Sequence, residues 1–171
     1  RRPPRSTQSR SSAASDVYKR QDKDRKPLTK GKEAEISQVR LLDNHGQEIS
    51  SIKTGEKLVV RIEYVAYLKI EHPTFTIAFY SIDGTLYAAY TTKFDEYEIE
   101  YLEGHGYIDI VFDSLNLLPG LFELSVSIAD RDALSTYDWH QRVYRLQVLV
   151  GKKGSGLVYL PHYWRLSQNS Y

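Results

Sequence analysis

Cysteine is absent from the 171 residues, so disulfide bonds and thiolate metal sites are excluded. This composition suits a reducing compartment, and a cytoplasmic location is the default expectation. Long apolar runs are also missing, because the longest are short strand-like stretches such as residues 58–60. A membrane helix needs roughly 20 apolar residues, and the sequence offers no candidate for one.

Catalytic motifs are lacking as well. There is no G-x-S-x-G elbow, no phosphate-cradling glycine loop and no H-E-x-x-H helix. The histidines are more than twenty residues apart and form no local ligand pair; they are His45, His72, His105, His140 and His162. We therefore expect no enzymatic activity, no metal and no cofactor, and ATP hydrolysis cannot reside in these residues.

Carboxylates crowd one stretch, residues 95–103, and are Asp95, Glu96, Glu98, Glu100 and Glu103. A glycosidase would need two of them facing each other across a cleft, but repulsion between like charges favours a solvated loop. The D-x-D-x-D-G spacing of a calcium loop is also missing. Tyr97 and Tyr101, together with Asp95 and Glu98, could form a lid over a sugar site, and a merely solubilising loop is the alternative.

Basic residues are concentrated in the first 21 positions, which carry six of them against one acidic residue and show no apolar periodicity. This segment resembles the translated adapter sequence that contaminates some gene fragments, and we predict a non-native or disordered tail. A basic arm that binds nucleic acid is the alternative. Without the segment the formal charge changes from +1 to −4, which leaves no electrostatic footprint for nucleic acid.

The charged residues 22–33 are predicted to be a linker that tethers something upstream, and residues 167–171 a short tail. Between them, over residues 34–166, apolar residues recur with a period of two between turn signals. Strands are predicted at 36–41 with a bulge, and at 57–67, 74–80, 85–92, 106–112, 121–129, 142–150 and 157–163. The fold class is all-β, an immunoglobulin-like antiparallel β-sandwich of about eight strands.

Several short motifs follow one another in a characteristic order. They are VRLLDNHG (39–46), TGEKL (54–58), FTIAF (75–79) then DG (83–84), LNLLPGLF (115–122), YD (137–138), and GLVYL (156–160) followed by Trp164. Their order resembles the Wzt-like C-terminal domain of the ATP-binding subunit of bacterial polysaccharide (O-antigen type) ABC exporters.

That resemblance implies a non-catalytic carbohydrate-binding module that recognises a finished polysaccharide before export. The ATPase domain would lie upstream, and a membrane permease would complete the system at the inner face of the bacterial inner membrane. The alternative is an immunoglobulin-like protein-interaction or dimerisation domain that binds no glycan.

Aromatic residues supply the candidate glycan surface, because sugars present C–H faces to rings, and the chain has 14 Tyr, 5 Phe and 2 Trp. Phe75, Phe79, Phe122 and Tyr144 share the register of aliphatic neighbours and are predicted to be core. Other rings alternate against the apolar register and are predicted to bind carbohydrate: Tyr67, Tyr80 and Tyr87. Ordinary cross-strand packing is the alternative for each of them.

A second candidate region combines a ring with hydrogen-bonding groups, namely Asp138, Trp139, His140 and Gln141. Tyr137 and Asp138 could instead form a structural corner.

At the C-terminus, the resemblance implies that the last strand is exchanged between two protomers of a homodimer, through Leu157, Val158, Tyr159, Leu160 and Trp164. Packing of Trp164 onto its own domain is the alternative.

Overall fold

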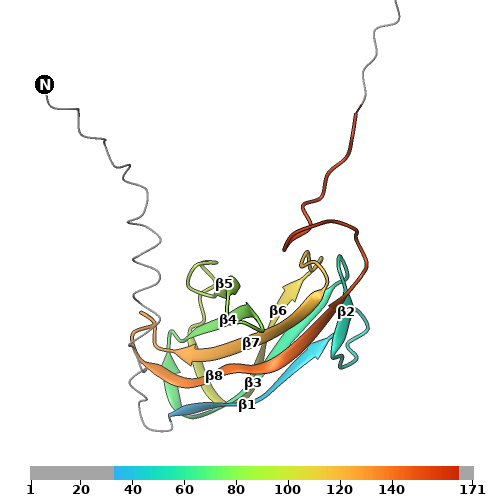
Figure 1. Cartoon of the computed structure of the whole chain (residues 1–171). Helices are drawn as coiled ribbons and strands as arrows, with labels where there is room; N and C mark the ends of the chain where they lie inside the picture. Colours follow the sequence, from blue (N-terminus) through green and yellow to red (C-terminus); the bar gives the residue numbers. More distant parts are fainter. Residues whose placement is uncertain (1–32, 166–171) are drawn as a thin grey trace, which may run out of the picture.

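The computed structural model describes residues 33–165, and over this range the backbone forms eight strands and no helix (Figure 1). The strands are β1 (Ala34–Leu42), β2 (Ser51–Lys53), β3 (Leu58–Glu71), β4 (Thr74–Ser81), β5 (Leu86–Thr91), β6 (Tyr101–Phe112), β7 (Gly120–Ala129) and β8 (Thr136–Leu149). The predicted all-β sandwich is confirmed. The predictions for residues 1–21, for all of the linker except Glu33, and for residues 167–171 lie outside the described range.

The strands form two sheets, one of three strands in the order β1-β3-β6 and one of five in the order β2-β8-β7-β4-β5. All pairs are antiparallel except the short pair of β2 with β8, which is parallel. This parallel pair involves β2, which was not among the predicted strands. Among the described residues, no helix is long and apolar enough to cross a membrane.

The core lies between the two sheets and follows the predicted alternation. On β3, Leu58, Val60 and Ile62 are no more than 2% exposed. On β4 and β7 every second residue is likewise buried: Phe75, Ile77, Phe79, Phe122, Leu124, Val126 and Ile128. Burying one such side chain contributes about 1.5–3 kcal/mol, so these three strands stabilise the sandwich most.

The predicted hairpin between β4 and β5 is present, and Gly84 adopts a φ of 90° in its turn. The Asp83 carboxylate accepts hydrogen bonds from the Ser81 hydroxyl and, at 2.9 Å, from the Thr85 amide. Because both bonds favour the ionised form, they lower the pKa of Asp83 to about 2. The bulge predicted in the first strand is also found, between Ile36 and Gln38.

Three strand predictions are corrected, and one strand was missed. Residues 157–163 form no strand, because their backbone bonds go to the loop before β7: Tyr159 N donates to Asn116 O at 2.7 Å. The three-residue β2 was missed, since it is too short to show a period. β6 begins at Tyr101 and β8 at Thr136, each earlier than predicted, because their first halves carry polar residues where an apolar alternation was required.

Candidate functional site

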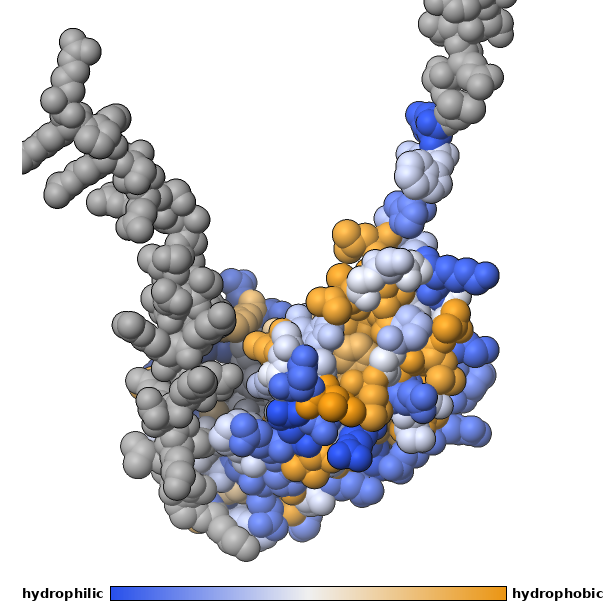
Figure 2. Space-filling model, in the orientation of Figure 1, coloured by the Kyte–Doolittle hydropathy of each residue, from blue (hydrophilic) through white to orange (hydrophobic). Residues whose placement is uncertain are grey.

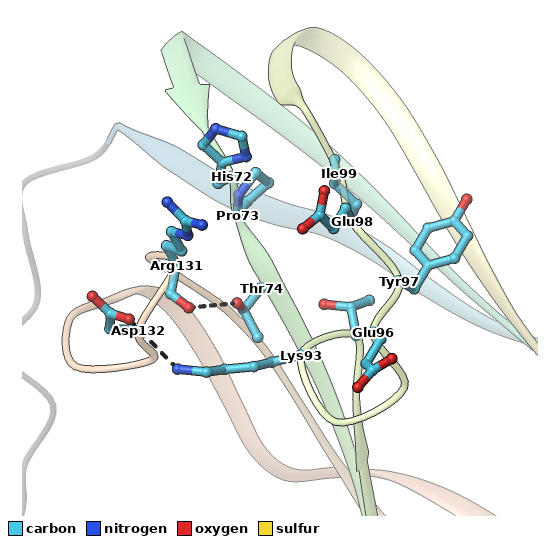
Figure 3. Close-up of a pocket in the computed structure, with 11 residues that line it drawn as sticks. His72, Pro73, Thr74, Lys93, Glu96, Tyr97, Glu98, Ile99, Arg131 and Asp132 are labelled. Carbon is cyan, nitrogen blue, oxygen red and sulfur yellow. Dashed lines mark hydrogen bonds and ion pairs between the residues drawn. The ribbon is translucent and has the colours of Figure 1, made fainter.

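A cavity of about 430 Å³ lies at one end of the sandwich (Figure 3). Three segments that are distant in sequence form it: residues 72–74 at the start of β4, residues 92–99 after β5, and residues 131–132 between β7 and β8. Figure 3 shows Arg131 and Asp132 on one side, with Glu96 and Tyr97 on the opposite side. The cavity therefore depends on how three loops are held relative to one another.

Hydrogen bonds fix the long loop after β5. The Thr92 amide donates to Phe75 O at 3.0 Å, and the Tyr97 amide donates to Thr92 O at 2.8 Å. Glu96 adopts a φ of 53°, a left-handed conformation that is uncommon for a non-glycine residue. The loop thus closes on itself and places residues 96–98 at the cavity wall.

The loop between β7 and β8 is held by Asp130, whose Oδ1 accepts the amides of Leu134 at 2.9 Å and Ser135 at 3.2 Å. Two contacts then connect this loop to the other segments. Thr74 Oγ1 lies 3.4 Å from Arg131 O, and Lys93 Nζ lies 3.5 Å from Asp132 Oδ1. These contacts connect all three segments that form the cavity.

The cavity lining is polar. Its nitrogen-bearing side chains are His72, Lys93 and Arg131, and its carboxylates are Glu96, Glu98 and Asp132. Ammonium and guanidinium groups donate hydrogen bonds and carboxylates accept them, so this set can satisfy a ligand rich in hydroxyl groups. Within residues 33–165, no group of three His, Asp or Glu side chains could hold a metal ion.

Tyr97 stands at the edge of this cavity, with its ring directed away from Arg131 (Figure 3). It also lines a second cavity of about 320 Å³, and Thr92 lines both. Of the proposed lid residues, Tyr97 and Glu98 line the first cavity and Asp95 lines the second. Tyr101 lies instead on β6, where Lys69 Nζ is 4.5 Å from its ring centre.

None of the seven residues predicted to bind carbohydrate lines the first cavity. Tyr67, on β3, is 53% exposed and its hydroxyl donates to Glu35 at 2.5 Å, which raises the pKa of Tyr67. Tyr80, on β4, is half-buried, and its ring centre lies 5.9 Å from the Arg142 guanidinium carbon. These two rings lie on different sheets and do not form one surface.

The placement expected for Tyr87 is wrong. The register of β4 with β5 shifts between Phe79 and Tyr80, which pairs Phe79 with Ala88 and Tyr80 with Leu86 and leaves Tyr87 as an extra residue. A bulge of this kind moves one side chain to the other face. Tyr87 therefore packs on the core, with its ring 5.3 Å from that of Phe122.

The predicted group of residues 138–141 is divided between the two faces of β8. Asp138 and His140 pair in register with Ile128 and Val126, so they face inward. Trp139 pairs with Ser127 on the outer face and is 36% exposed, and Gln141 is exposed. Because side chains alternate along a strand, the four residues cannot form one ligand edge.

Asp138 connects the two sheets, which supports the structural alternative. Its Oδ2 accepts the Ile36 amide of β1 at 2.7 Å and lies 3.3 Å from His140 Nε2. His140 Nδ1 is 2.5 Å from the Tyr144 hydroxyl. Burial and, to a lesser degree, the Asp138 charge raise the pKa of Tyr144. The predicted core position of Tyr144 is confirmed as partly buried.

Arg142 is a residue that sequence reasoning missed. It adopts a φ of 53° in the irregular part of β8, and its amide donates to Ser125 Oγ at 2.8 Å. Its guanidinium lies 2.7 Å from Glu123 Oε2 and 2.8 Å from Ile82 O. One side chain thus joins β8, β7 and the hairpin after β4, a role that a lone arginine in a strand does not reveal.

The family model described as the Wzt C-terminal domain matches residues 29–160. A crystal structure of the C-terminal domain of Wzt superposes with a TM-score of 0.74 at 14% identity, covering 82% of this chain and 87% of that one. No curated protein matches the sequence.

A second solved structure is more distant. The Niemann-Pick type C2 protein from the Japanese carpenter ant superposes with a TM-score of 0.50 at 6% identity, covering 68% of this chain and 92% of that one. At these identities both structures show a shared fold alone.

Proposed function

Because this chain belongs to the Wzt C-terminal domain family, we propose that it binds the polysaccharide cargo of an ABC exporter. The family is a non-catalytic domain of an ABC transporter subunit, so the chain is an exporter-associated domain whose partners include an ATPase and a membrane permease. The proposal adds the ligand, an O-antigen-type glycan, and a location at the cytoplasmic face of the bacterial inner membrane.

The polar cavity of Figure 3 supports this proposal. Its volume of about 430 Å³ lies within the roughly 300–1,000 Å³ of small-molecule sites. Nitrogen-bearing side chains come from all three segments (His72, Lys93 and Arg131) and carboxylates from two of them (Glu96, Glu98 and Asp132). Tyr97, which is 62% exposed, offers a ring at the edge. Hydroxyl groups of a sugar would bond to the polar side chains while a C–H face covers the ring.

The outer face of the five-stranded sheet is a second part of the proposed glycan surface. It carries Trp139 and Gln141 from β8 and Tyr80 from β4. Tyr67, on the other sheet, is a separate proposed contact for a polysaccharide that extends around the domain. Tyr87, Asp138 and His140 are not included, because their side chains face inward.

We expect Glu98→Ala to weaken polysaccharide binding about tenfold, the effect of losing a hydrogen bond to a charged group. The purified chain would first be screened against an array of O-antigen-type polysaccharides. The binding polysaccharide would then be titrated by calorimetry into wild-type and variant proteins. Arg131→Ala, on the opposite wall, should weaken binding similarly.

Glu103→Ala is the matched control, because Glu103 is an exposed glutamate on β6 that does not line the cavity. It should bind like the wild-type protein. Absence of binding to every polysaccharide, or equal affinity of the Glu98→Ala and Glu103→Ala proteins, would contradict the proposed site.

Apolar side chains of the C-terminal segment support the proposed homodimer. Leu157 is 57%, Val158 52% and Leu160 74% exposed. Figure 2 shows apolar surface gathered at the end of the molecule where this segment leaves the sandwich. Trp164 is 92% exposed, so the alternative that it packs onto its own core is wrong. Exchange of the segment, including Tyr159, between two copies would bury these groups.

Leu160→Asp should shift the protein from dimer to monomer at tens of micromolar, because a charge would enter the apolar contact. Light scattering after size-exclusion chromatography would measure the mass. Val143→Asp, at a position on β8 that is 62% exposed, should remain dimeric. A wild-type protein that is monomeric throughout this concentration range would refute the exchange.

A further inference from the structure

A second cavity, hereafter the edge cleft, opens between β5 and β6. These two strands are the edges of different sheets, and neither pairs with the other across the side of the sandwich. The edge cleft has a volume of about 320 Å³ and reaches Ile62 of β3 and Ile77 of β4 in its interior. It therefore leads from the surface to core side chains.

The wall of the edge cleft formed by β6 is apolar and incompletely covered. Ile108 and Ile110 line it and are only half-buried, whereas their partners in register, Ile62 and Val60, are 2% and 0% exposed. The small side chain at Ala88, opposite Phe79 on β5, contributes little cover on the facing side. An apolar group placed here would remove these isoleucines from water.

The mouth of the edge cleft has a different chemistry. The exposed lining residues include Tyr97, Asp95 and Tyr90, whose ring centre lies 5.3 Å from that of Phe112 on β6. The other carboxylate, Asp109, is held by Arg61 through hydrogen bonds of 2.8 and 2.7 Å. The Asp95 charge disfavours an anionic group at the mouth, so a fatty acid or a phosphate is a poor match, and an uncharged polar group is a better one.

The two cavities are neighbours, because Thr92 and Tyr97 line both. We propose that the edge cleft holds a hydrocarbon substituent of an uncharged glycoside whose sugar occupies the polar cavity. The ligand is thus amphiphilic: hydroxyl groups contact residues such as Glu98, the ligand passes Tyr97, and the apolar part lies against Ile108 and Ile110. The identity of the sugar part rests on the proposed function, whereas the apolar site rests on the edge cleft alone.

The test uses n-alkyl β-D-glucosides from methyl to octyl as probes, each kept below its micelle-forming concentration. Binding to the whole chain is measured by calorimetry. Full burial of one methylene corresponds to about 0.8 kcal/mol, so we expect affinity to rise about twofold to fourfold for each added methylene until the edge cleft is full.

Ile110→Trp fills the edge cleft with an apolar side chain and should abolish the dependence on chain length. Val65→Trp is the matched control, because Val65 pairs with Glu35 and His105 and faces away from the core. It should retain the dependence. Thermal unfolding of both variants establishes that they are folded, and Ile108→Ala, which enlarges the edge cleft, provides a second variant if Ile110→Trp is unstable.

Equal affinity for all chain lengths in the wild-type protein, or a dependence that persists in Ile110→Trp, would overturn the inference. A dependence that appears only in Leu160→Asp would also overturn it, because the edge cleft would then be occupied by the partner's C-terminal segment. Polysaccharide binding without a chain-length effect contradicts the inference and leaves the proposed function intact. A chain-length effect without binding to any polysaccharide supports the edge cleft as an apolar site and contradicts polysaccharide recognition.

Discussion

Phe79→Ala is expected to lower the free energy of unfolding by about 3–5 kcal/mol, the usual cost of truncating a buried phenylalanine. Phe79 is 1% exposed and lies on β4, an interior strand of the five-stranded sheet between β7 and β5. Its ring centre is 5.6 Å from that of Phe112 on the opposite sheet. The truncation would thus leave a cavity between the sheets. Urea denaturation followed by circular dichroism measures the change.

Phe94→Ala is the control for this prediction, since Phe94 is 71% exposed in the loop after β5. Its unfolding free energy should remain within about 0.5 kcal/mol of the wild-type value, as for most surface substitutions. If the two variants lost similar amounts of stability, the assignment of Phe79 to the core would be incorrect.

The strands that could be predicted are those whose large apolar residues recur at every second position. On β3 as far as Ala66, and on β4 and β7, this period of two is visible in the sequence and assigns these residues to the core face. Phe79 and Phe122 were placed in the core for this reason. The hairpin at Gly84 was also predictable, because few residues other than glycine adopt a positive φ in a tight turn.

Irregular pairing limits such predictions. One extra residue in β5 turned Tyr87 from the outer face to the core, and no residue type in LYAAYT marks that position. The segment 157–163 has the composition of a strand, yet its amide bonds go to a loop rather than to a sheet edge. Sequence patterns report the periodicity of a segment but not which partner accepts its hydrogen bonds.

The candidate site was only partly predictable for a related reason. Tyr97 and Glu98 were predicted as part of a possible lid over a sugar site, and both line the cavity. Their partners His72 and Arg131 come from loops that are 25 or more residues away in sequence. The juxtaposition depends on long-range contacts such as that of Thr74 with Arg131 O, which have no local sequence signal.

Arg142→Ala should cost about 2 kcal/mol of unfolding free energy, although the residue lies on the surface. Its Nη2 is 2.6 Å from Glu123 Oε2, and the Glu123 side chain is only 12% exposed. Removing one partner of a buried ion pair costs about 3–5 kcal/mol, and the 32% exposure of Arg142 reduces this value. Alanine retains the Cβ atom at a φ of 53°, so the substitution leaves the backbone strain unchanged.

Two further variants test whether the Arg142 contacts are the cause. Arg142→Lys should not restore stability, because an ammonium group cannot contact Glu123 and Ile82 O in the same planar arrangement. Arg145→Ala is the matched control: Arg145 is 71% exposed and lies 3.6 Å from the same carboxylate, so its loss should cost less than about 0.5 kcal/mol.

A double-mutant cycle with Glu123→Ala isolates the pair itself. If the ion pair holds β7 and β8 to the hairpin, the coupling energy between positions 142 and 123 should be about 1–2 kcal/mol, within the range for residues in direct contact. A coupling near zero, or full stability in Arg142→Ala, would show that the guanidinium is held in place by the sheet without contributing to its stability. The cycle requires only denaturation curves of four proteins under identical conditions.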